Sequence, residues 1–158
     1  VRAESEERRK IAAMTSQARD TTCTISPPLR YRNALAMIDW LCNAFGFERH
    51  AVYADGDTVH HAQLVFGNGM IMLGSASNAS AWNERMVQPD EIGGRETQAP
   101  CVIVADADAH CARAKAAGAE IVDAISSPDY GGRGYSCRDP EGHLWYFGSY
   151  DPWKDATQ

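Results

Sequence analysis

Apolar and polar residues alternate along this chain with two different periods, and the changes of period mark its elements. Over residues 33–45 the apolar side chains recur every three or four positions, which is the spacing of a helix. Asn33 opens this run as an N-cap, and Gly46 ends it. A second run over 107–117 is flanked in the same way, by an aspartate and a glycine. Strand-like segments surround both runs, so the pattern predicts two helices among short strands.

The residues that flank the two helices recur at a nearly constant distance. Asn33 corresponds to Asp106, 73 residues later, and Gly46 corresponds to Gly118, 72 residues later. A Gly-Ser pair also closes each copy, with the two pairs 74 residues apart. A unit of this size cannot bury its own sheet, so the two copies are expected to pack together. The predicted fold class is α+β, built from two βαβββ units.

The boundaries of the repeat divide the chain into a terminal segment, two units and a linker. The charged segment 1–21 is expected to be a helix or a tail. Residues 22–153 are expected to form a single domain, which contains the units 22–75 and 99–150. The polar, glycine-rich stretch 76–98 is the expected linker between them.

Charge, apolar runs and cysteine spacing exclude some classes of protein but do not identify a function. The net charge is −6 and the isoelectric point is about 5.3, which argues against a nucleic-acid partner because phosphate binding needs a basic face. No apolar run is long enough to cross a membrane. The five cysteines show no CxxC spacing, which favours reduced thiols and a cytoplasmic location.

Several stretches together resemble one known superfamily. They are VADADAHCARAKAAGAEIV, HAQLVFGNGMIMLG and GGRGYSCRDPEGHLWYFGSY, which together with the repeat cover most of the chain from Thr24 to Trp153. The sequence resembles the vicinal oxygen chelate superfamily, and within it the glyoxalase/bleomycin-resistance branch. The resemblance implies mixed, curled sheets that enclose a cleft, with the helices outside. It also implies a homodimer.

The resemblance places metal ligands on the first and last strands of each unit. In this chain those four positions hold Ser26, Met72, Ala99 and Tyr146. A divalent ion that polarises an oxygen or activates water needs imidazole or carboxylate ligands, and these residues supply neither. We therefore expect no bound metal ion, and we expect no other cofactor.

Alternation with a period of two predicts which side chains face the cleft. The expected ligand-binding residues are His61, Gln63, Met70, Met72, Cys101, Ile103, Tyr135, Leu144 and Tyr146. Arg30 is expected to add a further polar group on the same face. Tyr135 belongs to the set through its 74-residue offset from His61, and a difference of one residue in hairpin length would shift that assignment. Trp145 and Phe147 are expected on the helix-covered side.

A cleft with this lining predicts a protein that binds a small hydrophobic or aromatic molecule, because such pockets are mostly apolar with a few polar groups. In this interpretation the protein sequesters its ligand without a metal ion. The alternative is an enzyme of the same superfamily, of the lyase, isomerase or dioxygenase type. It would use non-standard metal ligands, or His61 or Tyr146 as proton-transfer groups. The sequence leaves open whether the protein is an enzyme.

Overall fold

The computed structural model describes residues 21–155. The expected helix or tail at 1–21 lies almost wholly outside the described residues. The first unit forms a four-stranded sheet, here called the N-terminal sheet, with the strand order β1-β4-β3-β2. Its elements are β1 (Pro28–Tyr31), α2 (Ala34–Phe45), β2 (Glu48–Asp55), β3 (Thr58–Phe66) and β4 (Gly69–Ser75).

The second unit repeats this arrangement in the C-terminal sheet, with the order β5-β8-β7-β6. Its elements are β5 (Cys101–Ile103), α3 (Ala107–Ala116), β6 (Glu120–Ser126), β7 (Gly134–Arg138) and β8 (Leu144–Gly148). In both sheets the outer pair that contains the first strand is parallel and the other pairs are antiparallel. The predicted α+β fold with two βαβββ units is confirmed.

The helix ends form as the sequence predicted. The Asn33 side chain accepts a hydrogen bond from the Ala36 backbone N–H at 3.3 Å, and the Asp106 side chain accepts one from the Ala109 N–H at 2.9 Å. After the helices, Gly46 and Gly118 adopt φ angles of +84° and +97°, which favour glycine.

The linker packs against the N-terminal sheet. It contains two 3₁₀ turns, η1 (Asn83–Arg85) and η2 (Pro89–Ile92). The Asn83 amide donates to the backbone carbonyl oxygens of Ser75 and Asn78 at 2.9 and 2.7 Å, which fixes η1 at the end of β4. A short helix, α4 (Pro152–Asp155), closes the described chain. None of the helices described is long and apolar enough to cross a membrane.

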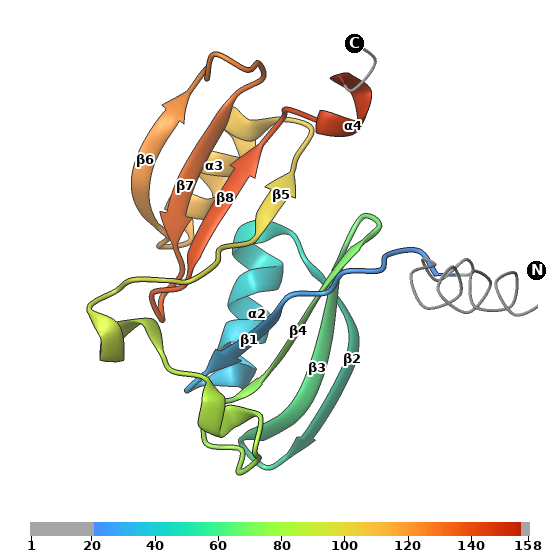
Figure 1. The fold of residues 1–158 in the computed structure, drawn as a ribbon, viewed down its shortest axis with the longest axis vertical. Helices are drawn as coiled ribbons and strands as arrows, with labels where there is room; N and C mark the ends of the chain where they lie inside the picture. Colours follow the sequence, from blue (N-terminus) through green and yellow to red (C-terminus); the bar gives the residue numbers. More distant parts are fainter. Residues whose placement is uncertain (1–20, 156–158) are drawn as a thin grey trace, which may run out of the picture.

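The helix-covered faces of the two sheets share one hydrophobic core. The Trp40 indole on α2 donates to the Ala117 carbonyl at the end of α3, at 2.8 Å. The ring of Phe45 on α2 lies 4.6 Å from that of Phe147 and 5.3 Å from that of Trp145, both on β8. Figure 1 shows α2 near the junction of the two sheets, which occupy the lower and upper halves of the molecule.

This shared core changes one detail of the expected architecture. The resemblance implied helices on the outside and a cleft between the two sheets of one chain. Here α2 and α3 contact each other, and His110 of α3 lies 2.9 Å through its Nε2 from the carbonyl oxygen of Phe45. The helices therefore lie between the two units. The sheet faces opposite the helices, here called the open faces, do not face each other across the chain's own core.

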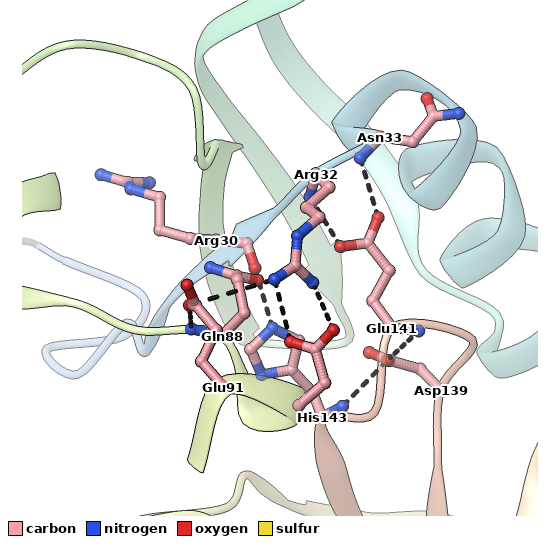
Figure 2. A network of polar contacts seen from close by, with 9 residues as sticks. Arg30, Arg32, Asn33, Gln88, Glu91, Asp139, Glu141 and His143 are labelled. Atoms are coloured by element: carbon pink, nitrogen blue, oxygen red, sulfur yellow. Dashed lines mark hydrogen bonds and ion pairs between the residues drawn. The ribbon is translucent and has the colours of Figure 1, made fainter. Parts of the chain in front are cut away.

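The turn after β7 joins the two units through the N-terminus of α2. The Glu141 carboxylate accepts hydrogen bonds from the backbone N–H groups of Arg32 and Asn33, at 2.6 and 2.8 Å (Figure 2). A carboxylate at this place satisfies orphan N–H groups and interacts favourably with the helix dipole. The acidic turn that helped to identify the superfamily is thus a joint between the units.

Two buried side chains complete this joint. Asp139 accepts the Tyr31 hydroxyl at 2.7 Å and the Trp145 indole N–H at 3.1 Å, and burial raises the pKa of its carboxyl group. His143 contacts the Arg30 carbonyl through Nε2 at 2.8 Å and the Glu96 carboxylate through Nδ1 at 2.9 Å. Figure 2 shows the Arg30 side chain pointing away from this network, although its backbone belongs to it. The joint thus fixes where β1 ends and α2 begins, while the Arg30 side chain points away from it.

Candidate functional site

The candidate site lies on the two open faces, which carry nearly all the residues predicted to bind a ligand. On β8, Trp145 and Phe147 are fully buried beneath the helices, whereas Leu144 and Tyr146 are half-buried on the opposite face. Strand β4 shows the same alternation, with its two methionines on the open side. The predicted division of these two strands into a covered face and an open face agrees with the structure.

On the N-terminal sheet, one row of side chains crosses β1, β4, β3 and β2. The row consists of two strand pairs: Arg30 on β1 pairs with Gly74 on β4, and His61 on β3 pairs with Tyr53 on β2. A Cβ atom on Gly74 would lie only 3.0 Å from the Arg30 Nη1, so the glycine gives the guanidinium room to lie across the strand. Arg30 Nε donates to the Asn83 side-chain oxygen, which holds the guanidinium in place.

Beside this row lies a second one that mixes polar and apolar groups. Met72 pairs with Gln63 across β4 and β3, and Met70 lies further along the same strand. Gln63 Nε2 lies 3.2 Å from His61 Nε2 and donates to it in the tautomer that carries its proton on Nδ1. The His61 ring also stacks near Tyr53, with 6.3 Å between the ring centroids. The N-terminal open face therefore offers cationic and amide donors next to thioether side chains.

The C-terminal open face is built around one tyrosine lying on two glycines. A Cβ atom on Gly134 would lie 2.7 Å from the Tyr146 Cζ, and one on Gly148 would lie 2.9 Å from its Cε1. No larger residue at either position leaves the ring where it is. The Tyr146 hydroxyl lies 3.0 Å from that of Tyr130, and the Tyr130 ring meets Tyr150 edge-on at 5.2 Å. Three aromatic rings thus gather here.

The hydrogen bond between the Tyr130 and Tyr146 hydroxyls is the largest cause that raises the pKa of Tyr146, with burial second, to about 12. The phenol therefore keeps its proton near neutral pH and acts as a hydrogen-bond donor. A proton-accepting role for Tyr146 would have to overcome this shift. The geometry favours contact with a ligand over base catalysis.

Tyr135 does not lie on the open face, and this prediction was wrong. Its side chain is only 1% exposed, and its hydroxyl lies 2.7 Å from Nδ1 of His110 on the helix-covered side. The register explains the error, because Gln63 pairs with Met72 and its counterpart Ser136 pairs with Tyr146. Ser136 and Tyr146 are ten residues apart in the sequence, whereas Gln63 and Met72 are nine apart, so the 74-residue offset that holds on β8 is wrong by one residue on β7.

The remaining predicted residues reach the surface at β5. Cys101 pairs with Tyr146 and Ile103 pairs with Gly148, and both side chains are exposed. Together with Met70 they line an apolar cavity of about 310 Å³ between the two sheets, whose other walls include Phe47 and Phe66. The described chain brings these three predicted residues together. The other open-face residues, His61, Gln63, Met72, Leu144 and Tyr146, do not line this cavity.

The positions to which the resemblance assigns metal ligands do not suit a divalent ion. Ser26 and Ala99 precede the strands, while Met72 lies beside Pro28 and Tyr146 beside Cys101. This donor set lacks the imidazole and carboxylate groups that the superfamily's ion requires. Within residues 21–155, His, Cys, Asp and Glu side chains nowhere gather in a group of three able to hold an ion.

Sequence analysis missed three parts of the site. Asn83 fixes Arg30 from the linker, and Tyr130 reaches Tyr146 from a loop, so neither contact follows from strand alternation. Gly134 and Gly148 are the third part. The sequence indicates these two glycines in one way only: they are small residues at positions where alternation predicts side chains that face the cleft.

Comparison with known proteins agrees with this architecture. A sequence profile of the Glyoxalase/Bleomycin resistance protein/Dioxygenase superfamily matches residues 22–147. The crystal structure of TioX from Micromonospora sp. ML1 is 33% identical, with a TM-score of 0.62, and the match covers 78% of this chain and 95% of TioX. The comparison with curated proteins gives no match.

Two more distant structures share the fold. A fosfomycin resistance protein, FosX from Listeria monocytogenes, was solved with Mn(II) and a dihydroxypropylphosphonic acid. It is 15% identical with a TM-score of 0.60, over 84% of this chain and 93% of FosX. Glyoxalase I from Zea mays is 15% identical with a TM-score of 0.61, over 78% of this chain and 43% of the maize protein. The repeat, the register and the profile match lead to one conclusion: this chain belongs to the glyoxalase/bleomycin resistance protein/dioxygenase superfamily.

Proposed function

We propose that this protein is a metal-free small-molecule-binding protein of the glyoxalase/bleomycin-resistance type, which acts in the cytoplasm and sequesters a hydrophobic or aromatic ligand. The observation that carries the proposal is the pair of open faces. They present methionine, tyrosine and isoleucine together with a few hydrogen-bonding groups, which is the composition of a ligand pocket. The ion-binding positions hold side chains that suit contact with an organic molecule.

The protein functions as a homodimer in this proposal, because each open face needs an opposing surface. Tyr53, Ile103 and Tyr130 on these faces are 60%, 48% and 59% exposed, which is a large apolar exposure for a single chain. Strands β1 and β5 are also edge strands in the described sheets, and unpaired edges favour association. In the dimer, the N-terminal face of one copy lies opposite the C-terminal face of its partner.

The cleft formed in this way suits a flat or irregular organic molecule. Methionine adapts its shape to a ligand, and a tyrosine ring lying flat on glycines offers a stacking surface. The affinity then comes from buried apolar area and a small number of hydrogen bonds. A drug-like ligand is in line with the presence of a fosfomycin resistance protein among the fold relatives.

Assembly is the first step to test. Sedimentation of the purified chain at micromolar concentration is expected to show a dimer. Ile103→Asp, which places a charge on the exposed edge strand β5, is expected to shift it to the monomer. A parent protein that sediments as a monomer contradicts the proposed assembly.

Ligand binding is then tested by a thermal-shift screen with neutral aromatic and drug-like compounds, followed by titration. Hits are expected to raise the melting temperature of the parent, because ligand binding to the folded state alone stabilises it. Tyr146→Ala and His61→Ala are expected to weaken binding, whereas Trp153→Ala, at an exposed site outside the faces, leaves it unchanged. Equal binding by all variants, or a stoichiometric metal ion in the purified protein, contradicts the proposal.

A further inference from the structure

Arg30 is a cation on the N-terminal open face that forms no ion pair with any carboxylate of the described residues. Other arginines of the chain form ion pairs, such as Arg32 with Asp90, Arg49 with Asp39 and Arg133 with Asp108. Within residues 21–155, Arg30 donates only to the Asn83 side-chain oxygen and to the Leu29 carbonyl, the latter at 3.1 Å. Partial burial lowers the pKa of its guanidinium, in keeping with a charge that no nearby anion offsets.

The guanidinium is positioned rather than free to move. Asn83 accepts from Nε, and Asn83 is itself anchored by the hydrogen bonds that its amide makes with the turn after β4. Gly74 leaves room for Nη1 on the sheet surface. A guanidinium has five N–H donors, and the two hydrogen bonds of Arg30 leave three of them unused by the described chain. Held in this way, the group loses little conformational entropy on pairing with an anion.

The neighbours of Arg30 within the two rows of the open face are hydrogen-bonding and apolar groups. Towards the linker, Arg30 shares a small cavity with Arg32 and Glu91, which pair with each other at 4.0 Å. His61 and Tyr53 continue its row, and Gln63 lies in the next row beside Met72. No acidic side chain stands in either row. Arg30 is thus the charged side chain of these two rows, in a chain whose net charge is −6.

We propose that the N-terminal open face binds the oxyanion, a carboxylate or phosphonate, of an otherwise flat and apolar ligand. Arg30 is the charge partner, His61 and Gln63 are hydrogen-bond donors, and the methionines of β4 contact the apolar body. Planar pairing of a guanidinium with an oxyanion through two N–H groups is strong and directional. This inference rests on the proposed ligand-binding function and names its ligand class.

The experiment compares ligands that differ only in charge. The full-length purified protein is titrated by calorimetry with 2-naphthoate, 2-naphthylphosphonate and neutral 2-naphthamide. We expect one or both anions to bind about tenfold to a hundredfold more tightly than the amide, which is the range for a hydrogen bond to a charged group. Added salt is expected to weaken the binding of the two anions and to leave the affinity for the amide unchanged. The two anion arms separate a carboxylate site from a phosphonate site.

Variants then assign the preference to Arg30. Arg30→Gln is expected to abolish the preference for anions, while Arg30→Lys keeps part of it because the charge remains without the Asn83 hydrogen bond. Arg49→Gln is the matched control, since Arg49 lies on the same sheet and pairs with Asp39 on α2. Melting temperatures of all variants confirm that each is folded.

The outcomes separate this inference from the function on which it rests. If the amide binds as tightly as the anions, or if Arg30→Gln keeps the preference, the anion site is refuted and ligand binding stands. If none of the three binds while the neutral screen gives hits, the anion site is again refuted. If neither the naphthyl compounds nor the screen gives a ligand, both proposals fail.

Discussion

The two open faces use the same backbone positions for different chemistry. Gly74 on β4 and Gly148 on β8 stand at equivalent places in the repeat, and each makes room for a large side chain. Over Gly74 lies the guanidinium of Arg30, whose counterpart in the second unit is Ile103. Over Gly148 lies the ring of Tyr146, whose counterpart in the first unit is Met72. The N-terminal face is therefore cationic and rich in amide donors, while the C-terminal face is aromatic.

This difference shows that a repeat can keep the residues that determine its fold, here called the frame, while the side chains on its open faces, here called the surface, change. The caps, the glycines that end the helices and the strand register recur because they determine how each unit folds. The open-face side chains carry no part of the shared core, so they diverge at little cost in stability. In the proposed dimer the two unlike faces meet across one cleft. A single ligand then contacts a cation on one side and a phenol platform on the other.

The largest effect is expected from adjacent residues on β8 that lie on opposite faces. Trp145→Ala is expected to destabilise the fold by about 3–5 kcal/mol, because it leaves a cavity in the core that both units share. Tyr146→Ala is expected to cost less than about 1 kcal/mol of stability, since its ring is partly exposed, while it weakens ligand binding. Chemical denaturation measures both changes.

Trp145→Phe is a milder variant for the case that Trp145→Ala does not fold. Its loss of stability is expected to lie between those of the two alanine variants. If Tyr146→Ala is as destabilising as Trp145→Ala, the division between frame and surface is wrong. In that case the open face is part of the core.

A medium effect is expected from filling the space under the tyrosine ring. Gly134→Ala brings a Cβ atom against the Tyr146 ring, so overpacking is expected to cost about 1–3 kcal/mol and to move the ring off the sheet. Binding of aromatic ligands is expected to weaken as well. Gly69→Ala is the control, because its Cβ would meet only the Phe66 carbonyl oxygen, at an ordinary 3.4 Å. An unchanged Tyr146 environment by NMR in Gly134→Ala contradicts the glycine platform.

The smallest effect is expected at His110, where α3 contacts α2 between the two units. Burial is the main cause that lowers the pKa of His110 in the folded state, with a smaller contribution from Arg113. The unfolded chain therefore takes up this proton more readily, so the stability that neutral His110 contributes is present above about pH 6.5 and is lost as the pH falls below it.

His110→Gln keeps a donor and an acceptor without a charge that titrates. Its melting temperature is expected to fall less than that of the parent between pH 7.5 and 5.5. The difference between the two proteins isolates His110 from the other histidines. If the melting temperatures of the parent and His110→Gln fall in parallel with pH, protonation of His110 does not affect stability.

Much of this protein follows from local sequence. Asn33 and Asp106 cap helices, Gly46 and Gly118 end them, and the alternation on β4 and β8 assigns side chains to the correct faces. These features depend on interactions within a few residues, so the sequence states them directly. The repeat then extends the assignment from one unit to the other, wherever the two units have connections of equal length.

Other features of this protein depend on contacts between segments that are far apart in the sequence, and only the tertiary structure decided them. The paired residues of β7 and β8 are one residue further apart in the sequence than those of β3 and β4, which turned Tyr135 into the core, although its offset from His61 placed it on the open face. Asn83 reaches Arg30 across 53 residues. The packing of α2 against α3 placed the helices between the units and left the open faces uncovered. Periodicity assigns a side chain to one face of its own strand, whereas packing between separate elements decides what lies opposite that face.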